Sequence, residues 1–159
     1  MEPRIESIKE IKLIGMHLPM NLLNNRTAEL WGSFSPRIQE ILNRVTTDRI
    51  SLQNYDASYF TQFSPAASFE KWATVEVSNF KYIPLGMQSL VVPSGLYAVF
   101  DYKGSSAASD IFQYIYASWI PNSRYQIARR PHFEVLGEKY RNNDPNSEEE
   151  IWIPIESVD

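Results

Sequence analysis

Residues 129–155 read RRPHFEVLGEKYRNNDPNSEEEIWIPI, and this stretch restricts the fold more than any other part of the sequence. Two runs that favour extended structure flank a polar turn at 142–147, as in two strands joined by a loop. In the second run, isoleucines alternate with other residues over 151–155, and Trp152 lies between two of them. In the first run, Glu134 lies between a phenylalanine and a valine, so a carboxylate occupies a strand that otherwise enters a core.

The sequence resembles itself after a shift of 80 residues. This shift aligns Gly15 with Gly95, Phe34 with Tyr114, Phe60 with Tyr140 and Trp72 with Trp152. The element types that we expect also recur in the same order in both halves: extended, helix, extended, extended. We therefore predict an α+β fold with a tandem βαββ repeat, in a single domain over 1–159 with units at about 4–82 and 85–156.

In the first unit, we expect an extended run over 5–18, a helix that begins with Thr27 as N-cap, and strands near 50–60 and 70–79. Pro36 is expected to kink or restart this helix. The apolar face of the predicted helix consists of Leu30, Phe34, Ile38, Ile41, Leu42 and Val45.

In the second unit, a turn signal at 93–95 interrupts a long apolar run and places a strand at 96–102. Gly104, Ser105 and Ser106 are expected to open a helix that ends before Pro121, with the serine hydroxyl groups as caps. Its apolar side contains Ile111, Ile115 and either Ser118 or Trp119. Two further strands are predicted at about 126–140 and 150–155.

The two halves are expected to join antiparallel sheets with both helices on one face, and with a ligand cleft between the halves on an open concave face. Alternation directs the isoleucines of 151–155 toward the helices and Trp152 toward the open face; by the repeat, Trp72 shares that face. In the preceding strand we predict that Phe133 and Val135 point toward the helices. The predicted cleft then contains Glu134, Leu136, Trp72, Trp152 and Tyr140, with Trp119 as an addition.

A carboxylate in an apolar cleft without a basic partner has a raised pKa or binds a cation, because its unpaired burial costs several kcal/mol. A lipophilic cation offers both a charge for Glu134 and rings that pack on tryptophan and tyrosine. An alternative interpretation is a solvated carboxylate that pairs with Arg130, Lys139 or Arg141. Spacing alone leaves both interpretations open.

Composition excludes several classes of protein. The 159 residues carry a net charge of −4 and include no cysteine, which argues against direct nucleic-acid binding and excludes disulfides and thiolate chemistry. The N-terminal segment lacks the pattern of a signal peptide, and no apolar run approaches the ~18 residues of a membrane span. We therefore expect a cytoplasmic protein without membrane contact.

Catalytic and metal-binding patterns are weak. His17 and His132 do not form a metal-ligand pattern, and no cofactor motif is present, so no metal and no cofactor are expected. The acidic run 148–150 is interpreted as a solvated turn. An enzyme, if it exists here, is a hydrolase with Glu134 as general base and Tyr140 as hydrogen-bond donor.

The C-terminal stretch, together with YIYASWIPNSRY at 114–125 and TAELWGSFSPRI at 27–38, resembles the GyrI-like small-molecule-binding domain family. This family also provides the effector-binding domains of AraC-type and MerR-type transcription regulators. The resemblance covers about residues 4–155 and implies a tandem βαββ fold, binding of hydrophobic and often cationic compounds, and a ligand-facing glutamate that corresponds to Glu134. The family pattern has an aromatic residue two positions later, where this chain has Leu136.

The resemblance leaves three functions open: a stand-alone binder of amphipathic compounds from a multidrug-binding fold, a hydrolase of small electrophilic compounds, and a modulator of a protein partner such as DNA gyrase. The two repeats use the whole chain, so we expect no helix-turn-helix. Neither a monomer nor a homodimer is favoured by the sequence.

Overall fold

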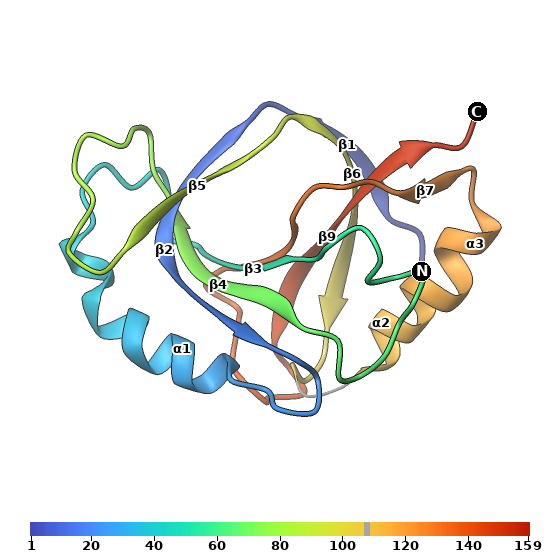
Figure 1. The fold of residues 1–159 in the computed structure, drawn as a ribbon, viewed down its shortest axis with the longest axis horizontal. Helices are drawn as coiled ribbons and strands as arrows, with labels where there is room; N and C mark the ends of the chain where they lie inside the picture. Colours follow the sequence, from blue (N-terminus) through green and yellow to red (C-terminus); the bar gives the residue numbers. More distant parts are fainter. Residues whose placement is uncertain (107–108) are drawn as a thin grey trace.

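The computed structural model describes residues 1–106 and 109–159, which fold around one curved sheet (Figure 1). The strands of these residues are β1 (Arg4–Ile8), β2 (Ile11–Met20), β3 (Arg49–Asn54), β4 (Phe69–Glu76), β5 (Gln88–Val92), β6 (Gly95–Lys103), β7 (Tyr125–Ile127), β8 (His132–Leu136) and β9 (Glu148–Ser157). The helical segments are α1 (Thr27–Phe34), the 3₁₀ segment η1 (Ser35–Glu40), α2 (Asp110–Tyr114), the π-helical segment η2 (Ile115–Trp119) and α3 (Ile120–Asn122). The predicted α+β class with an antiparallel sheet is confirmed.

Strand pairing follows the order β1-β6-β9-β8-β3-β4-β2-β5, and β7 pairs with β9 outside this path. β3 and β8 therefore meet at the centre of the sheet. Only two residues separate β1 from β2 and only two separate β5 from β6, although each pair lies at opposite ends of the pairing order. These short connections require the sheet to curl until its two edges approach each other (Figure 1).

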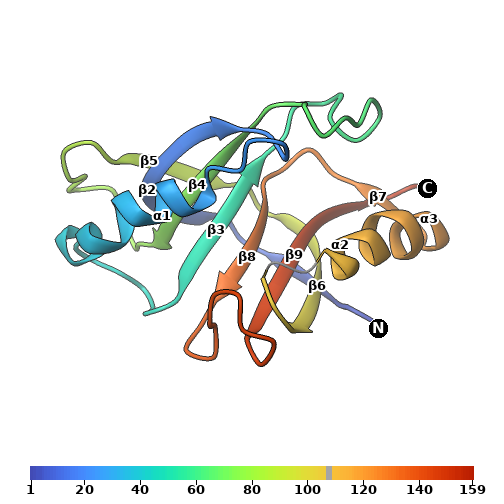
Figure 2. The ribbon, with the colours of Figure 1, turned by 90° about the horizontal axis from the view of Figure 1, so that it is seen from below.

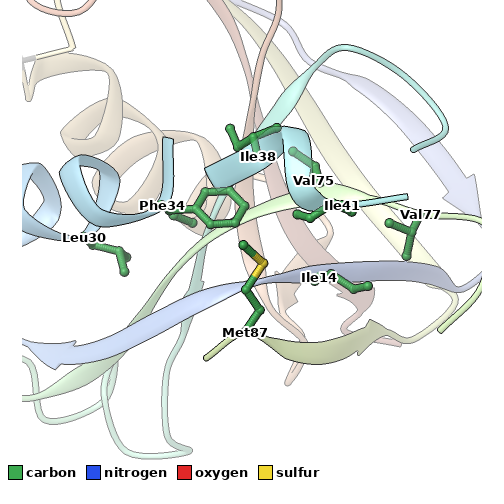
Figure 3. Packing of buried hydrophobic residues seen from close by; sticks show 9 residues of the cluster. Ile14, Leu30, Phe34, Ile38, Ile41, Val75, Val77 and Met87 are labelled. Atoms are coloured by element: carbon green, nitrogen blue, oxygen red, sulfur yellow. The ribbon is translucent and has the colours of Figure 1, made fainter. Parts of the chain in front are cut away.

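One apolar core lies between α1, η1 and the strands β2 and β4. Phe34 of α1 is fully buried, and Ile38 of η1 is 6% exposed. Both belong to one cluster with Ile14 of β2 and Val75 of β4, as Figure 3 shows. A helix with a narrow apolar face is stabilised mainly by this kind of packing.

A second apolar core lies between α2, η2 and the strands β6 and β9. Ile111 and Ile115 pack with the isoleucines of β9, which confirms the predicted direction of residues 151–155. The strand register places Ala73, Ser51, Glu134 and Ile151 in one row across β4, β3, β8 and β9. This row runs from the core under α1 to the core under α2, and β3 and β8 lie between the two helices in Figure 2.

The interior of the curled sheet is filled by a third apolar core. Its buried members are Leu13, Ile50, Leu52, Trp72, Val92, Tyr97, Val99 and Phe133, with Ile8, Ile11, Leu90, Val135 and Trp152 packed against them. The predicted open concave wall is therefore wrong, because side chains from both ends of the sheet occupy that space.

The predicted direction of β8 is also wrong. Phe133 pairs with Leu52 and Trp152 and stacks on Trp152 with 5.2 Å between ring centroids, so it points into the interior core. Glu134 consequently points to the other side, toward the row that joins the helix-packed cores. Alternation within a strand correctly predicted which of its residues share a face. Which face of the sheet these residues occupy depends on the pairing register with the neighbouring strands.

Several predicted boundaries need correction. The N-cap position of α1 is Arg26 rather than Thr27, and no side-chain cap bond is present there. The α-helix ends at Phe34 and continues as a 3₁₀ segment with Pro36 in its first turn. Leu42 and Val45, predicted on the apolar face, are 56% and 51% exposed.

The predicted strands also change in extent. The segment expected to be extended over 50–60 is a strand only as far as Asn54, and the segment at 126–140 divides into β7 and β8. The second helical region continues past Pro121 to Asn122. Among the helices of the described residues, none combines the length and the apolar character that a bilayer span requires.

The interior core predicts a large effect of truncating Phe133, which is 2% exposed and stacked on Trp152. Phe133→Ala is expected to lower the free energy of unfolding by about 3–5 kcal/mol, because the deleted ring leaves a cavity. Phe63→Ala, at a 56% exposed ring, is the matched control and should change stability by less than about 1 kcal/mol. Urea unfolding of both variants measures the difference, and equal losses would contradict the described interior core.

Candidate functional site

Polar side chains gather on the central strands, on the side of the sheet that Glu134 faces. Ser51 and Gln53 of β3, Lys71 of β4 and His132 of β8 are only 3% to 7% exposed. Lys71, Gln53 and His132 form one row across the strands, and Ser51 lies opposite Glu134 in the adjacent row. We call these five residues the polar strip.

The polar strip interrupts an otherwise apolar surface. The core under α1 and the core under α2 share no residue among the part of the chain that the structure describes, and the strip lies between them. Burying polar groups at the centre of a sheet costs free energy unless they find partners. The strip is therefore the strongest candidate for a functional site.

The carboxyl group of Glu134 lies in the middle of the strip. The side chain retains partial exposure, yet the protein around it displaces most of the water that would solvate its charge. This burial raises the pKa of Glu134, while the positive charge of Lys71 and a side-chain hydrogen bond from Gln53 act to lower it. Burial dominates, so the carboxylate is less favourable here than in water.

Lys71 is the positively charged residue whose charge acts on the Glu134 carboxylate. Burial lowers the pKa of its ammonium group, and the carboxylates of Glu134 and Glu149 act to raise it. No carboxylate oxygen of the described residues approaches the ammonium within the 4.0 Å of an ion pair. Lys71 therefore acts on Glu134 through space rather than through a direct contact.

Glu149 adds a second carboxyl group at the edge of the strip. It precedes Ile151 by two positions in β9 and so points to the same side of the sheet as Ile151 and Glu134. Burial, and then the charge of Glu134, raise the pKa of Glu149 to about 7, against a smaller lowering by Lys71. The prediction of a fully solvated acidic turn is wrong for Glu149, which is half-buried.

Four aromatic residues close one end of the strip. Tyr55, Tyr59 and Phe60 follow β3, and Tyr116 comes from η2; we call them the aromatic cap. Phe60 lies 5.0 Å from Tyr116 between ring centroids, and Tyr55 lies 4.3 Å from Tyr59. These segments are far apart in the sequence, and the ring contacts hold them together.

The imidazole of His132 joins the aromatic cap to the strip. It stacks on Phe60 at 5.2 Å between centroids and meets Tyr55 edge-on at 4.9 Å. Its Nδ1 atom lies 2.9 Å from the hydroxyl group of Tyr116, within hydrogen-bonding distance. Burial lowers the pKa of His132 to about 3, so the ring is neutral in the folded protein at pH 7.

The hydroxyl groups of the cap lie within the electrostatic reach of Glu134. Burial raises the pKa values of Tyr55 and Tyr116 well above 10, and the charge of Glu134 contributes to both shifts. The two phenols remain protonated donors at neutral pH. Tyr116 belongs to a π-helical segment, a widened geometry that is frequent at functional sites.

Only part of the predicted site comes together. Leu136 lies two positions after Glu134 in β8 and points to the same side. Burial raises the pKa of Tyr140, and the charges of Glu149 and Glu134 add to this shift, so Tyr140 lies within their electrostatic reach. Its hydroxyl group donates to Asn142 at 3.2 Å.

The three tryptophans that were predicted beside Glu134 lie elsewhere. Trp72 and Trp152 belong to the interior core, on the opposite side of the sheet. Trp119 packs edge-on against Phe100 at 5.4 Å and stacks near Tyr125 at 6.2 Å.

The basic residues proposed as partners of Glu134 make other contacts. Arg130 donates to the carbonyl groups of Leu96 and Ile155 and lies over the ring of Tyr97. Arg141 donates to backbone carbonyl groups of its own loop, and Lys139 is exposed. Across the described ranges, no ion pair within 4.0 Å involves Glu134.

Sequence reasoning missed Lys71, Gln53, Glu149 and the aromatic cap. The signal available for Lys71 was its place beside the alternating apolar residues of the predicted strand at 70–79, where a lysine precedes Trp72. The cap residues lie in a tyrosine- and phenylalanine-rich segment at 55–63. Over residues 1–106 and 109–159, no group of three or more histidine, aspartate or glutamate side chains is arranged to hold a metal ion.

The sequence matches a protein family along almost its whole length. Residues 4–155 match Cass2, the integron-associated effector binding protein family. The chain belongs to this family, and the GyrI-like resemblance is confirmed. No curated protein matches the chain significantly.

Solved structures share the fold at low sequence identity. SAV2435 bound to tetraphenylphosphonium has a TM-score of 0.69 and 16% identity, and the match covers 98% of this chain and 94% of SAV2435. The Vibrio cholerae integron cassette protein VCH_CASS2 has a TM-score of 0.66 and 15% identity, with coverages of 98% and 96%. The EcmrR C-terminal domain has a TM-score of 0.72 and 13% identity, with coverages of 99% and 98%.

The buried imidazole of His132 predicts a specific pH dependence of stability. Its pKa is about 3 in the folded protein against 6.5 ordinarily, so the unfolded state gains a proton first as the pH falls below 6.5. His132→Gln removes this titration while keeping an acceptor for Tyr116. Urea unfolding at pH 7.5 and pH 5 should show the wild type losing about 2 kcal/mol more stability than the variant. An equal loss in both proteins would contradict a neutral, buried His132.

Proposed function

We propose that this chain is a small-molecule-binding protein that takes hydrophobic cations at the polar strip, beneath the aromatic cap. Membership of an effector-binding family supports a small-molecule ligand. The charge of the ligand and the role of Glu134 as its counter-charge are inferences from the site itself.

The observation that carries the proposal is the surplus of negative charge in a desolvated site. Among the described residues, the carboxyl groups of Glu134 and Glu149 and the ammonium group of Lys71 influence one another electrostatically. When both carboxyl groups are ionised, one positive charge therefore balances only one of two negative charges. Burial raises the pKa of both carboxyl groups, which means that each lacks sufficient stabilisation of its charged form. A bound monocation provides that stabilisation and makes the site electrically neutral.

The aromatic cap supplies the second requirement for binding a lipophilic cation. Faces of tyrosine and phenylalanine rings attract cations, with about 0.5–2 kcal/mol per contact, and remove apolar ligand surface from water. Tyr55 and Tyr116 lie within the electrostatic reach of Glu134, so rings and counter-charge are close enough to serve one ligand. SAV2435, which shares this fold, has been solved with such a cation, tetraphenylphosphonium.

The pairing order also supports the proposed tandem repeat. Each side of the β3–β8 pair continues outward through a last strand of one unit (β4 or β9) and a first strand (β2 or β6). Trp72 and Trp152 lie in corresponding strands, β4 and β9, and in the same interior core. In this arrangement α1 and α2 are corresponding helices on one face, and the ligand lies between the two halves.

A hydrolase is the second candidate, because burial raises the pKa of Glu134 toward the range of a general base and Tyr140 lies within its electrostatic reach. If the protein is a hydrolase, Glu134→Gln retains binding of a substrate analogue and loses turnover. The binding function is favoured because the aromatic cap and the charge surplus account for the site without a reaction.

Glu134→Gln keeps the shape of the side chain and removes its charge. We expect the affinity for tetraphenylphosphonium to fall about 10- to 100-fold, as for loss of a charged, partly desolvated partner. The affinity for tetraphenylmethane-type neutral analogues, solubilised by a short polyether tail, should change less than about threefold. Isothermal titration calorimetry measures both.

Glu138→Gln, at an exposed carboxylate in the next loop, is the matched control and should leave both affinities unchanged. Equal losses for the cation and for the neutral analogue would contradict the counter-charge role. Wild-type turnover of an electrophilic ester that disappears in Glu134→Gln would support the hydrolase.

The pKa of Glu149, about 7, predicts pH-dependent binding of a cation that does not titrate. At pH 8 Glu149 is ionised and attracts the cation, whereas at pH 6 it is protonated and neutral. The dissociation constant for tetraphenylphosphonium should therefore rise by up to about tenfold from pH 8 to pH 6. Glu149→Gln should reduce this ratio to near one, and an unchanged ratio in the variant would contradict the role of Glu149.

A further inference from the structure

The ammonium group of Lys71 lacks a bonded partner in the site. Its side chain is 6% exposed, and the ammonium carries three hydrogen-bond donors. Among the residues that the structure describes, it makes neither a hydrogen bond nor an ion pair at the distances that define these contacts. The ammonium nitrogen is not among the fully buried side-chain atoms without a partner, so solvent reaches it, and a ligand that covers it must offer an acceptor of its own.

The neighbouring side chains that the structure describes make no hydrogen bond with these donors. Gln53 is directly opposite Lys71 in β3, and its side chain donates to Glu134. Glu134 and Glu149 influence the ammonium only through space. On the same side of β4, the residues on either side are Phe69 and Ala73, which offer no side-chain acceptor.

We propose that Lys71 binds an oxygen acceptor on the ligand, so that the site selects aromatic cations that also carry a carbonyl or carboxylate oxygen. The inference rests on the proposed function and names the ligand class more narrowly. The cationic centre lies at Glu134, the rings contact the aromatic cap, and the oxygen accepts a hydrogen bond from the Lys71 ammonium. A purely hydrocarbon cation leaves this ammonium unsatisfied and close to a like charge.

The charges of the strip favour this division of roles. Lys71 of β4 and Glu134 of β8 are separated by the intervening strand β3 and by two residues along it, since Lys71 pairs with Gln53 while Glu134 pairs with Ser51. Donor and counter-charge are therefore distinct positions within one strip, and one drug-sized ligand can contact both. A hydrogen bond from an ammonium group is shorter and stronger than one between neutral groups.

The test uses tetraphenylphosphonium with one ring substituted at the meta or para position. Three substituents are compared: acetyl, which is a neutral acceptor; carboxylate, which is a charged acceptor; and isopropyl, which has a similar size and no acceptor. We expect the better acetyl isomer to bind the wild type about 10- to 100-fold more tightly than the isopropyl compound. The carboxylate compound shows whether a charged acceptor is preferred to a neutral one.

Lys71→Met should abolish the preference for acetyl over isopropyl and should leave or strengthen binding of unsubstituted tetraphenylphosphonium, because a like charge is removed. Lys81→Met, at an exposed lysine, is the matched control and should keep the preference. Thermal unfolding checks that the variant folds. If Lys71→Met does not fold, Lys71→Leu, which also lacks a donor, replaces it, and the wild-type comparison requires no variant.

Equal affinities of the wild type for the acceptor and isopropyl compounds at both positions would overturn the inference, as would a preference that survives in Lys71→Met. In either of these cases, the proposed function would still be supported if unsubstituted tetraphenylphosphonium binds and its affinity depends on Glu134. Absence of binding for every phosphonium compound would overturn both.

Discussion

The register between β3 and β8 is the constraint on which the rest of this structure depends. It sets Leu52 opposite Phe133 and Ser51 opposite Glu134 at the centre of the sheet. Alternate residues of a strand point to opposite faces, so this single choice sends the large apolar side chains into the interior and Glu134 to the other side. A shift by one residue would bury the carboxylate among Trp72 and Trp152 and expose Phe133.

The same register explains how a polar site persists at the centre of a sheet. The interior core and the two helix-packed cores supply the burial that stabilises the fold, and none of them requires the strip to be apolar. The strip can therefore keep groups such as Lys71 and Glu134, whose charged forms are poorly solvated. A ligand that satisfies them recovers free energy that the unliganded protein forgoes.

Local patterns in the sequence correctly predicted the class of fold, the antiparallel strands and the resemblance of the chain to the GyrI-like family. Local patterns did not predict which side chains of different strands lie next to each other, because strand pairing decides this. The sequence contains no direct sign that β3 lies between β4 and β8, and therefore none that Lys71 lies near Glu134. Trp72 and Trp152 were rightly given one face, but tryptophans in strands fill cores as readily as they line sites. The aromatic cap escaped notice because it follows β3 in a segment without periodicity.

A crystal structure with tetraphenylphosphonium bound tests the central claim most directly. The account predicts the phosphonium centre on the side of the sheet that Glu134 faces, between α1 and α2, with phenyl rings against Tyr55 or Tyr116 and the Glu134 carboxylate as the nearest anion. A cation seated in the interior among Trp72 and Trp152, or bound at a surface remote from Glu134, would contradict it.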